Sequence, residues 1–507
     1  MANSVQRTWT TCSLSIALMC SAPFVVHAQN EEDALRSSYI APGGTARSVG
    51  MANAFGALGA DGVAVMINPA GMGLYRRSEL SFTPSLEVNG VSSRYYGTSS
   101  TDSKSRFYFG NLALVLNAPA ERGSDWRSGT FGVIYDRQAT QHWARQAMGK
   151  GIATSILDDF ASRAEGTTTA GLFTDPYLQF NAALAYDTYG IDPLDPSDSL
   201  STSYVAALPF GAKVDQSNTI DSRGAISNTS FFYSGNYMDR LYIGLSVGVV
   251  GYRYRHVLTH TETVPDESVD LKDLSYRDEL TTTGNGVDVK AGFIYRFHDR
   301  FRMGAAFHSP MWLQLNDAYV STMKTNFRTP SPTDGRTSYS STSPDGVYNY
   351  RIASPWRTVL SAAYTAGENG LVSVDYEYAD YSKMRLRRSN RLLDAYDYVA
   401  ENEAVSNSFR ATHSVRVGTE WRAGNWYFRM GWGFVPDPFE KSDLRHGQAL
   451  RTYAGGIGYR TDHVGVDLGV NYAERTTSFF QYDPTLVNTT VEQRSNIRTL
   501  VTVSLRP

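Results

Sequence analysis

From residue 78 onward, apolar and polar residues alternate along much of the chain. In the segment 463–480, Val464, Val466 and Leu468 share one face, and Asp467 and Asn471 share the other. An alternation with a period of two residues is typical of a β-strand with one apolar and one polar face. The pattern therefore predicts an all-β chain.

The alternating segments predict about fourteen strands. They are 78–97, 105–119, 128–141, 225–236, 240–256, 284–297, 300–316, 350–366, 370–388, 409–423, 425–436, 449–460, 463–480 and 494–506. An even number of antiparallel strands returns the chain to the side on which it began, as in single-chain bacterial barrels.

The connections between these strands alternate between short and long. The short turns lie at 237–240, 297–300, 367–370, 423–425 and 460–463, and the long polar connections at 257–283, 317–350, 389–408, 437–448 and 481–493. A soluble β-sandwich has no reason to collect its long loops at one end, whereas outer-membrane barrels have short periplasmic turns and long external loops. We therefore predict an antiparallel transmembrane β-barrel of about fourteen strands, comprising residues 78–507, with periplasmic termini.

One connection, 142–224, is too long to be a plain loop. Ile152, Ile156, Leu157 and Phe160 recur in it at roughly helical spacing, which predicts a partly helical extracellular insertion. It is either a small self-packed lid or an exposed apolar groove that captures a hydrophobic ligand through these four residues.

The first 28 residues have the pattern of a secretory signal peptide. Arg7 is their only charged side chain, an apolar stretch follows it, and Val26-His27-Ala28 is a plausible cleavage site. The protein's two cysteines, Cys12 and Cys20, both lie in this leader. The mature chain is thus expected to lack thiols, which excludes disulfides, cysteine zinc sites and thiol nucleophiles.

Composition narrows the function classes further. The formal net charge of −3 argues against a nucleic-acid-binding protein, which needs a concentrated basic face. The 32 Tyr, 23 Phe and 8 Trp residues suit the aromatic girdles of a membrane barrel. The scattered histidines show no Ser-His-acid pattern, so we predict no enzyme, no catalytic residue, no cofactor and no metal site.

A segment of small residues precedes the first strand. Residues 60–72 end in a turn-forming sequence made of Asn68, Pro69, Ala70 and Gly71. Small residues ahead of a barrel predict a plug, or hatch, over residues 29–77. Pro69 either simply stops a helix and holds Asn68 extended, or belongs to a part of the hatch that moves or contacts ligand.

Three short sequences in this segment carry a resemblance to a known family. They are Pro-Gly-Gly-Thr-Ala-Arg-Ser at 42–48, Asn-Ala-Phe-Gly-Ala at 53–57 and Asn-Pro-Ala-Gly at 68–71, and the strand sequence at 302–310 is also similar. The chain resembles the FadL-type outer-membrane transporters of long-chain fatty acids and other hydrophobic compounds, in the branch found in Bacteroidetes-like bacteria. The resemblance implies a hatch inside a fourteen-stranded barrel.

The resemblance also implies a passive route for a hydrophobic small molecule. External loops capture the ligand, an apolar site in the barrel holds it, and a shift of the hatch opens a lateral exit into the membrane lipid. The exit lies at a kink in the third strand, here 128–141, where Gly129 and Gly132 are the candidate weak points. A monomer, with lipid and ligand as its partners, is expected.

The polar faces of the strands hold candidate partners for a carboxylate head group. These are Arg47, in the hatch, and Arg302, Arg416 and Arg429, in the strands. The alternative role of the same arginines, which we favour, is to seat the hatch by pairing with acidic residues, namely Asp288, Asp375, Glu377, Glu420 and Asp467.

Alternative functions remain open at the level of sequence. Long Ser/Thr-rich loops such as 328–348 suit a surface structural or adhesive barrel, and a non-specific pore would have the same strand pattern. His256 and His260 lie four residues apart at a strand end, where a haem receptor is conceivable. The identity of a transported ligand does not follow from these patterns.

Overall fold

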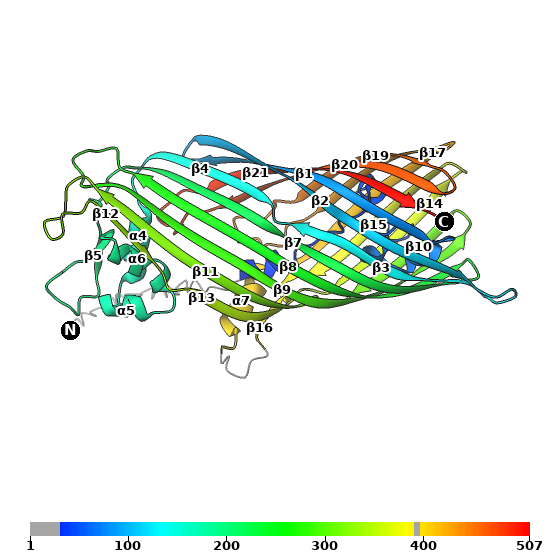
Figure 1. Ribbon diagram of the computed structural model, residues 1–507, viewed down its shortest axis with the longest axis horizontal. Coiled ribbons are helices and arrows are strands. Elements are labelled where there is room, and N and C mark those ends of the chain that lie inside the picture. Colours follow the sequence, from blue (N-terminus) through cyan, green and yellow to red (C-terminus); the bar gives the residue numbers. More distant parts are fainter. Residues whose placement is uncertain (1–30, 390–395) are drawn as a thin grey trace, which may run out of the picture.

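The chain folds into a closed antiparallel β-barrel that contains short helices in its interior and carries others at one end (Figure 1). The computed structural model describes residues 31–389 and 396–507; the predicted signal peptide, residues 1–28, lies outside them. Within the described residues, fourteen strand positions run round the barrel. The first strand pairs with both the second and the last, so the sheet closes on itself. The predicted barrel is confirmed.

Most strand positions are single continuous segments. These are β1 (Glu79–Tyr95), β2 (Thr98–Pro119), β7 (Val214–Tyr237), β8 (Leu241–Thr263), β9 (Leu271–His298), β17 (Ala411–Ala423), β18 (Trp426–Val435), β19 (Leu450–Arg460), β20 (Val464–Phe479) and β21 (Thr490–Leu505). The remaining positions are interrupted. One consists of β3 (Trp126–Thr140) and β4 (Trp143–Ile152), and the next of β10 (Phe301–His308) and β11 (Trp312–Phe327). A third consists of β12 (Ser338–Thr342), β13 (Gly346–Ala353) and β14 (Arg357–Ala366), and the fourth of β15 (Gly370–Asp380) and β16 (Arg385–Arg388).

The two faces of the strands are separated as the alternation predicts. On β20, Val464 and Leu468 are 40% and 41% exposed on the outside, whereas Asp467 is 1% exposed on the inside. Apolar side chains that face outward in this way are typical of a barrel surrounded by lipid. Charged side chains at the level of this apolar band, such as Asp467, instead point into the lumen, where they find partners.

Aromatic pairs stand on the outer face near the short turns. The ring centroids of Trp126 and Tyr237 are 5.3 Å apart, and those of Trp426 and Tyr459 are 5.0 Å apart. We call the end that carries these turns and the C-terminus the turn end, and the opposite end the loop end. Aromatic residues collected at one level of the wall are typical of a membrane interface.

The strands extend further toward the loop end than the sequence pattern predicts. Most of the predicted loops 257–283 and 317–350 is strand, because β8 ends at Thr263, β9 begins at Leu271 and β11 ends at Phe327. Both faces of these extensions are rich in polar residues, so they lack the apolar alternation by which strands are recognised. Their threonines still favour extended backbone.

Short helices occupy two places. Inside the barrel lie α1 (Glu31–Ser38), α2 (Ala46–Val49), α3 (Ala64–Ile67) and η1 (Pro69–Leu74). At the loop end lie α4 (Ile156–Ala164), α5 (Thr169–Thr174), η2 (Leu178–Phe180) and α6 (Ala182–Asp187) with the small strands β5 (Ile191–Pro193) and β6 (Tyr204–Ala206), while η3 (Tyr381–Lys383) and α7 (Val399–Ser408) follow later in the chain. None of the helices in residues 31–389 and 396–507 is long and apolar enough to cross a membrane.

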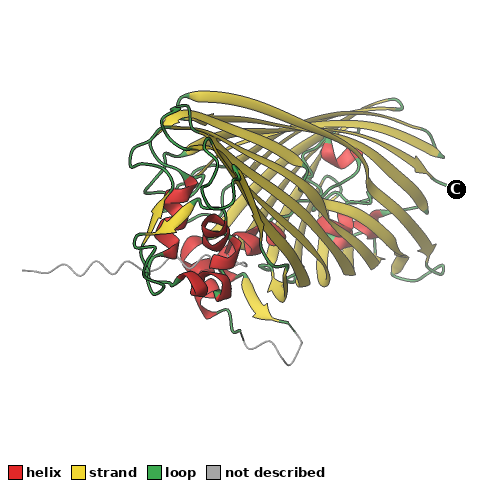
Figure 2. Cartoon of the chain, turned by 60° about the vertical axis from the view of Figure 1, so that its left-hand side comes forward, coloured by secondary structure: helices red, strands yellow, loops and turns green. Residues whose placement is uncertain are grey.

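The stretch 142–224, predicted as an insertion, is partly barrel wall. Trp143 of β4 pairs with Ser222 of β7, and this ladder continues toward the loop end. Residues 153–213 between these strands contain the helices grouped at that end of the barrel (Figure 2). We call residues 153–213 the cap.

Candidate functional site

The segment that precedes β1 lies inside the barrel and touches opposite walls. We call residues 31–75 the inner segment. Its helix α2 contacts β19, β20 and β21, and its helix η1 contacts β7, β8 and β9. Because these strands lie on opposite sides of the barrel, the inner segment extends across the lumen.

Glycines in the wall allow the backbone of the inner segment to approach the strands closely. A Cβ atom at Gly431 of β18 would lie 2.3 Å from the carbonyl carbon of Met51, and one at Gly244 of β8 would lie 2.3 Å from that of Pro69. Such separations are far shorter than any real Cβ contact. The two walls therefore fit the inner segment only while these positions carry no side chain.

Asn68 joins the inner segment to itself and to β9. Its amide nitrogen donates hydrogen bonds to the carbonyl oxygens of Gly56, at 2.8 Å, and Phe293, at 3.1 Å. Its side-chain oxygen accepts a hydrogen bond from the backbone N–H of Ala70, and Pro69 begins the short helix η1. Asn68 and Pro69 thus form a compact N-terminal cap of η1 against the wall.

Two buried carboxylates of the wall hold loops of the inner segment. Asp375 of β15 accepts the backbone N–H groups of Phe55 and Gly56, each at 2.9 Å. Asp136 of β3 accepts those of Gly43 and Gly44, at 2.9 and 3.0 Å. Hydrogen bonds to an ionised acceptor are stronger than neutral ones, so the two loops are held firmly.

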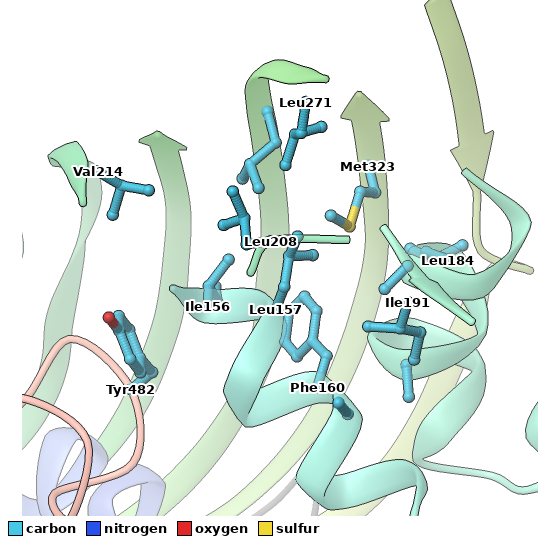
Figure 3. Close-up of a cluster of buried hydrophobic side chains, with 14 of the residues drawn as sticks. Ile156, Leu157, Phe160, Leu184, Ile191, Leu208, Val214, Leu271, Met323 and Tyr482 are labelled. Carbon is cyan, nitrogen blue, oxygen red and sulfur yellow. The ribbon is translucent and has the colours of Figure 1, made fainter. Parts of the chain in front are cut away.

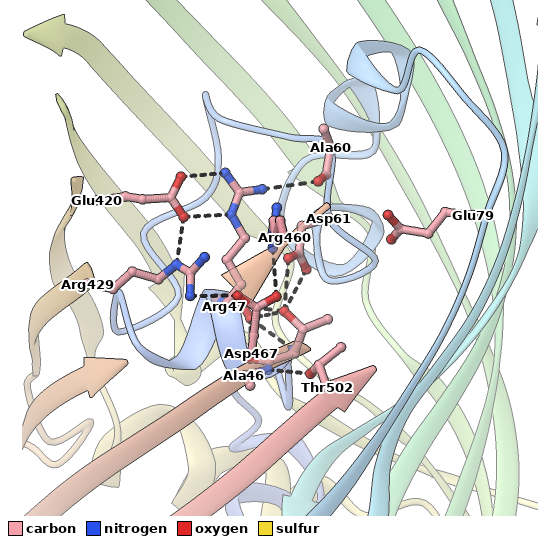
Figure 4. A network of polar contacts seen from close by, with 12 residues as sticks. Ala46, Arg47, Ala60, Asp61, Glu79, Glu420, Arg429, Arg460, Asp467 and Thr502 are labelled. Atoms are coloured by element: carbon pink, nitrogen blue, oxygen red, sulfur yellow. Dashed lines mark hydrogen bonds and ion pairs between the residues drawn. The ribbon is translucent and has the colours of Figure 1, made fainter. Parts of the chain in front are cut away.

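A chain of ion pairs fastens the middle of the inner segment (Figure 4). Arg47 binds Glu420 of β17 through two hydrogen bonds of 2.9 Å, and Arg429 of β18 binds the same carboxylate at 2.6 Å. Arg429 also contacts Asp467 of β20 at 2.8 Å, and Asp467 in turn pairs with Arg460. The structure therefore brings two of the candidate arginines, Arg47 and Arg429, together on one carboxylate.

Asp61 adds a second carboxylate beside this chain. It accepts a hydrogen bond of 2.9 Å from the hydroxyl of Thr45, which caps helix α2. Burial raises the pKa of Asp61, and the nearby Arg47 partly offsets that rise. The charged residues around α2 thus depend on one another.

The other two candidate arginines lie apart from this chain. Arg302 of β10 donates a hydrogen bond of 3.3 Å to the carbonyl oxygen of Leu58, and Arg416 of β17 pairs with Glu377 of β15. Arg416 and Glu377 line a cavity of about 20 Å³ between the inner segment and the wall. That volume accommodates about one water molecule.

A second group of arginines gathers toward the loop end and was not among the sequence candidates. We call it the basic wall. Its members Arg145, Arg475, Arg494 and Arg498 face the lumen from β4, β20 and β21, whereas Arg106 of β2 and Arg137 of β3 lie where β2 and β3 separate, with the Arg137 guanidinium 4.6 Å from the ring centroid of Tyr108. Arg475 and Arg494 lie directly opposite each other on neighbouring strands. The alternation of side chains along β20 and β21 already places Arg475 and Arg498 in the lumen. Only the register between strands shows that the six arginines gather on one side of the barrel.

Carboxylates balance the basic wall only in part. Glu492 pairs with Arg145 at 3.0 Å and with Arg494 at 2.7 Å. Glu87 stands between Arg106 and Arg498 in the ladder. The Nε and Nη1 atoms of Arg137 are buried and, among the described residues, have no hydrogen-bond partner. This wall therefore has capacity for an added anion.

The opposite side of the lumen is aromatic and apolar. Its buried residues come mainly from β8, β11 and β13 and include Tyr252, Tyr254, Leu313, Leu315, Tyr350 and Ile352. Helix α1 packs on this surface, and the guanidinium of Arg36 lies 4.1 Å from the ring centroid of Tyr254. We call this surface the tyrosine wall. It stands opposite the basic wall, and its six side chains are at most 4% exposed because helix α1 and neighbouring residues cover them.

The third strand position is interrupted, but not at the predicted glycines. Gly129 and Gly132 lie in regular register with both β2 and β7. The irregularities fall instead at Arg127, at Gln138 and between β3 and β4, near residue 141. In the described structure, the ladder between β2 and β3 covers only Asn111–Pro119 of β2, although β2 continues toward the loop end up to Thr98.

The candidate capture residues form the core of the cap. Ile152, Ile156, Leu157 and Phe160 are at most 5% exposed and pack with residues such as Leu184, Met323 and Tyr482 (Figure 3). Met323 belongs to β11 and Tyr482 to the connection before β21, so the cap is anchored to the wall on two sides. These contacts are those of a packed lid, and in this structure the four side chains line no exposed groove.

The cap should lose its packing if Leu157 is shortened. Leu157 is 0% exposed, and a Leu→Ala change at such a site costs about 2–5 kcal/mol. We expect Leu157→Ala to make residues 153–213 sensitive to limited proteolysis while the barrel stays resistant. Leu200→Ala is the matched control, because Leu200 is 74% exposed. Equal resistance of both variants would contradict this expectation.

Known proteins resemble the chain in structure rather than in sequence. No protein-family model and no curated protein matches the sequence. Among solved structures, a Pseudomonas aeruginosa FadL homologue matches with a TM-score of 0.50 and 13% identity, over 92% of this chain and 98% of that one. The toluene transporters TbuX of Ralstonia pickettii and TodX of Pseudomonas putida each match with a TM-score of 0.49, at 15% and 14% identity, over 91% of this chain and 98% and 97% of theirs.

The likeness to the Pseudomonas aeruginosa FadL homologue covers nearly the full length of both chains. At 13% identity it concerns the fold. It confirms the predicted FadL-type barrel architecture.

Proposed function

We propose that the protein is an outer-membrane transporter of hydrophobic compounds, and that its preferred ligands are amphiphiles with an anionic head, such as long-chain fatty acids. The loop end faces outward and the turn end faces the periplasm. The observation that carries the proposal is the juxtaposition of the basic wall and the tyrosine wall in one lumen, which the inner segment crosses nearer the turn end.

The inner segment serves as the hatch of this transporter. Its charged and hydrogen-bonded contacts to β3, β15 and β17 hold it across the lumen, so it obstructs an open aqueous path. A closed lumen favours a binding protein over a non-specific pore. Asn68 and Pro69, which contact β9 and β8, form the part of the hatch through which a shift of the wall is transmitted.

The space between the basic wall and the tyrosine wall suits an amphiphile once helix α1 of the hatch moves off the tyrosine wall. Each methylene group of an acyl chain contributes about 0.8 kcal/mol when it is buried against apolar surface. A carboxylate would meet the unpaired nitrogens of Arg137 or the opposed guanidinium groups of Arg475 and Arg494. We therefore assign the head-group role to the basic wall, and the seating of the hatch to Arg47, Arg302, Arg416 and Arg429.

The short ladder between β2 and β3 supports a lateral exit. Within the described residues the two strands do not pair beyond Asn111, and the hydroxyl of Ser100 of β2 instead donates a hydrogen bond to the backbone carbonyl oxygen of Gln146 of β4. A seam with few backbone hydrogen bonds opens at a lower free-energy cost than a regular ladder. A hydrophobic ligand would leave there into the membrane lipid.

Uptake assays test the proposal. In cells that express the protein, we expect Arg137→Gln with Arg498→Gln to lower uptake of labelled oleate by about tenfold, since charge-assisted hydrogen bonds to the carboxylate are lost. Uptake of labelled toluene, which has no charge, should stay near the wild-type level. Arg94→Gln with Arg336→Gln, at two exposed positions, is the control.

The outcomes separate the candidate functions. If cells that express the wild-type protein take up neither compound faster than cells with an empty vector, and the purified protein conducts ions steadily in a bilayer, the protein is a non-specific pore and not a transporter. Unchanged oleate uptake in the double variant would contradict the head-group role. His260 gives little support to a haem receptor, because its ring nitrogen is buried against Glu262 at 2.9 Å.

A further inference from the structure

Four arginines gather on the outer face of three neighbouring strands. Arg223 lies on β7, Arg253 and Arg255 lie on β8, and Arg277 lies on β9. The side chains of Arg223, Arg255 and Arg277 are 60%, 52% and 45% exposed. We call these four residues the outer arginine patch. They face away from the lumen and take no part in the proposed transport route.

The patch concentrates like charges. Arg223 and Arg255 lie directly opposite each other on β7 and β8, an arrangement that is destabilising unless an anion lies nearby. Glu279 is shared by Arg255 and Arg277, each at 2.9 Å. Asp221 binds Arg223 but is also paired with Lys104, at 2.8 Å. The two carboxylates therefore leave the patch with excess positive charge.

The patch begins where the apolar outer surface ends. On β8 the outward residues Leu245, Val247 and Val249 are 52%, 46% and 49% exposed, and Gly251 separates them from Arg253. Arg253 lies about 13 Å along the strand from Val249. Guanidinium groups just beyond a lipid-facing band stand at the level of lipid head groups, on the loop end of the barrel.

We propose that the outer arginine patch binds the phosphate groups of a glycolipid in the outer leaflet, whose acyl chains lie along the apolar residues of β8. The inference rests on the proposed placement of the loop end outside the cell. Planar guanidinium groups bind phosphate oxygens through two parallel hydrogen bonds, which suits several arginines around one phosphate. The carboxylates of the patch already bind arginines, which disfavours a divalent cation as the occupant.

Lipid binding to the purified mature protein tests this site. The probe is lipid A with two phosphates, titrated against protein in an uncharged detergent with EDTA and followed by native mass spectrometry. We expect Arg253→Gln with Arg255→Gln to weaken binding about tenfold or more, because charge-assisted hydrogen bonds are lost. Lys272→Gln with Arg336→Gln, which removes two exposed charges elsewhere at the loop end, should bind like wild type.

Two further arms identify the source of the phosphate. Dephosphorylated lipid A should bind the wild-type protein weakly, with an affinity similar to that of intact lipid A for the double variant. Excess inorganic pyrophosphate should displace little of the intact lipid A from the wild-type protein. Equal binding of both lipids, or of lipid A to wild type and the double variant, would overturn the proposal. Full displacement by pyrophosphate would replace the lipid with a soluble phosphate.

Folding and transport are checked separately. If the first double variant does not show the heat-modifiable migration of a folded barrel, Arg223→Gln with Arg277→Gln provides the same test on the neighbouring strands. Oleate uptake should persist in either variant. A protein that transports nothing can still bind lipid A at the patch, so the two proposals fail independently.

Discussion

Replacing Gly431 by alanine should loosen the inner segment and open the lumen. The added Cβ would lie 2.3 Å from the carbonyl carbon of Met51 and 2.4 Å from the backbone nitrogen of Ala52. Backbone atoms cannot rotate aside as a side chain would, so the whole turn must move. Overpacking of this kind costs about 1–3 kcal/mol. If this cost falls on the closed state, the fraction of molecules with an open lumen rises about 5- to 150-fold.

Gly433→Ala is the matched control on the same strand. Gly433 also faces inward, but a Cβ there would meet its nearest neighbour, the Cβ of Thr452, at 3.5 Å, which is ordinary contact. Ion conductance in planar bilayers and sensitivity of cells to a large hydrophilic antibiotic measure the opening. We expect both to rise in Gly431→Ala, and further when Gly244→Ala is added at the opposite wall.

A folded Gly431→Ala variant with wild-type conductance would show that the inner segment does not close the lumen. A thiol probe provides an independent measurement. Both cysteines of the chain lie in the predicted signal peptide, residues 1–28, so in protein produced without these residues Ala57→Cys provides a single thiol, at a position that is 0% exposed. Its labelling should accelerate in parallel with the conductance.

The strand pattern carried the prediction of the barrel because alternation is a local property. Val464 and Asp467 differ by burial in a way that the sequence of one strand already shows. The same logic failed for residues 257–263 and 271–283. These residues lie in strands that extend beyond the apolar band toward the loop end, where neither face of the strand needs apolar side chains. Apolar alternation reports on lipid contact, and polar extensions therefore escape it.

The functional residues were harder to predict because they depend on register. The sequence gives no sign that Arg475 stands opposite Arg494, or that Arg47 and Arg429 meet at Glu420. Each pair joins residues from separate strands or from the inner segment and a strand. The alternation along a strand shows which residues face the lumen. The position of a residue along the barrel axis, and its neighbours on other strands, follow from the shear of the whole barrel.

Glycine was similarly ambiguous. Gly132 appeared as a weak point of its strand, yet its missing side chain leaves room for the carbonyl oxygen of Leu114 on β2, 2.0 Å from where a Cβ would lie. At Gly431 and Gly244 the missing side chain leaves room for the inner segment instead. A glycine in a strand indicates a close approach, but the sequence does not say of what.

Glu420→Gln should release the inner segment more strongly than any other single change in the ion-pair chain. Glu420 binds both Arg47 and Arg429, so its neutralisation leaves two buried guanidinium groups without their shared carboxylate. Breaking a buried pair on one side costs about 3–5 kcal/mol. In the Ala57→Cys background, we expect thiol labelling to accelerate by about two to four orders of magnitude.

A double-mutant cycle with Arg47→Met distinguishes this from a general loss of stability. Arg47→Met alone should have a smaller effect, because Glu420 keeps Arg429 at 2.6 Å. In the Glu420→Gln variant the charge of Arg47 no longer has its carboxylate partner. Adding Arg47→Met to that variant should therefore change the labelling rate little. Glu474→Gln, on the outer face of β20 beside Tyr472, removes the same charge outside the lumen and should label like wild type. Additive effects of Arg47→Met and Glu420→Gln would mean that the two residues act independently, and that the ion pair does not hold the inner segment in place.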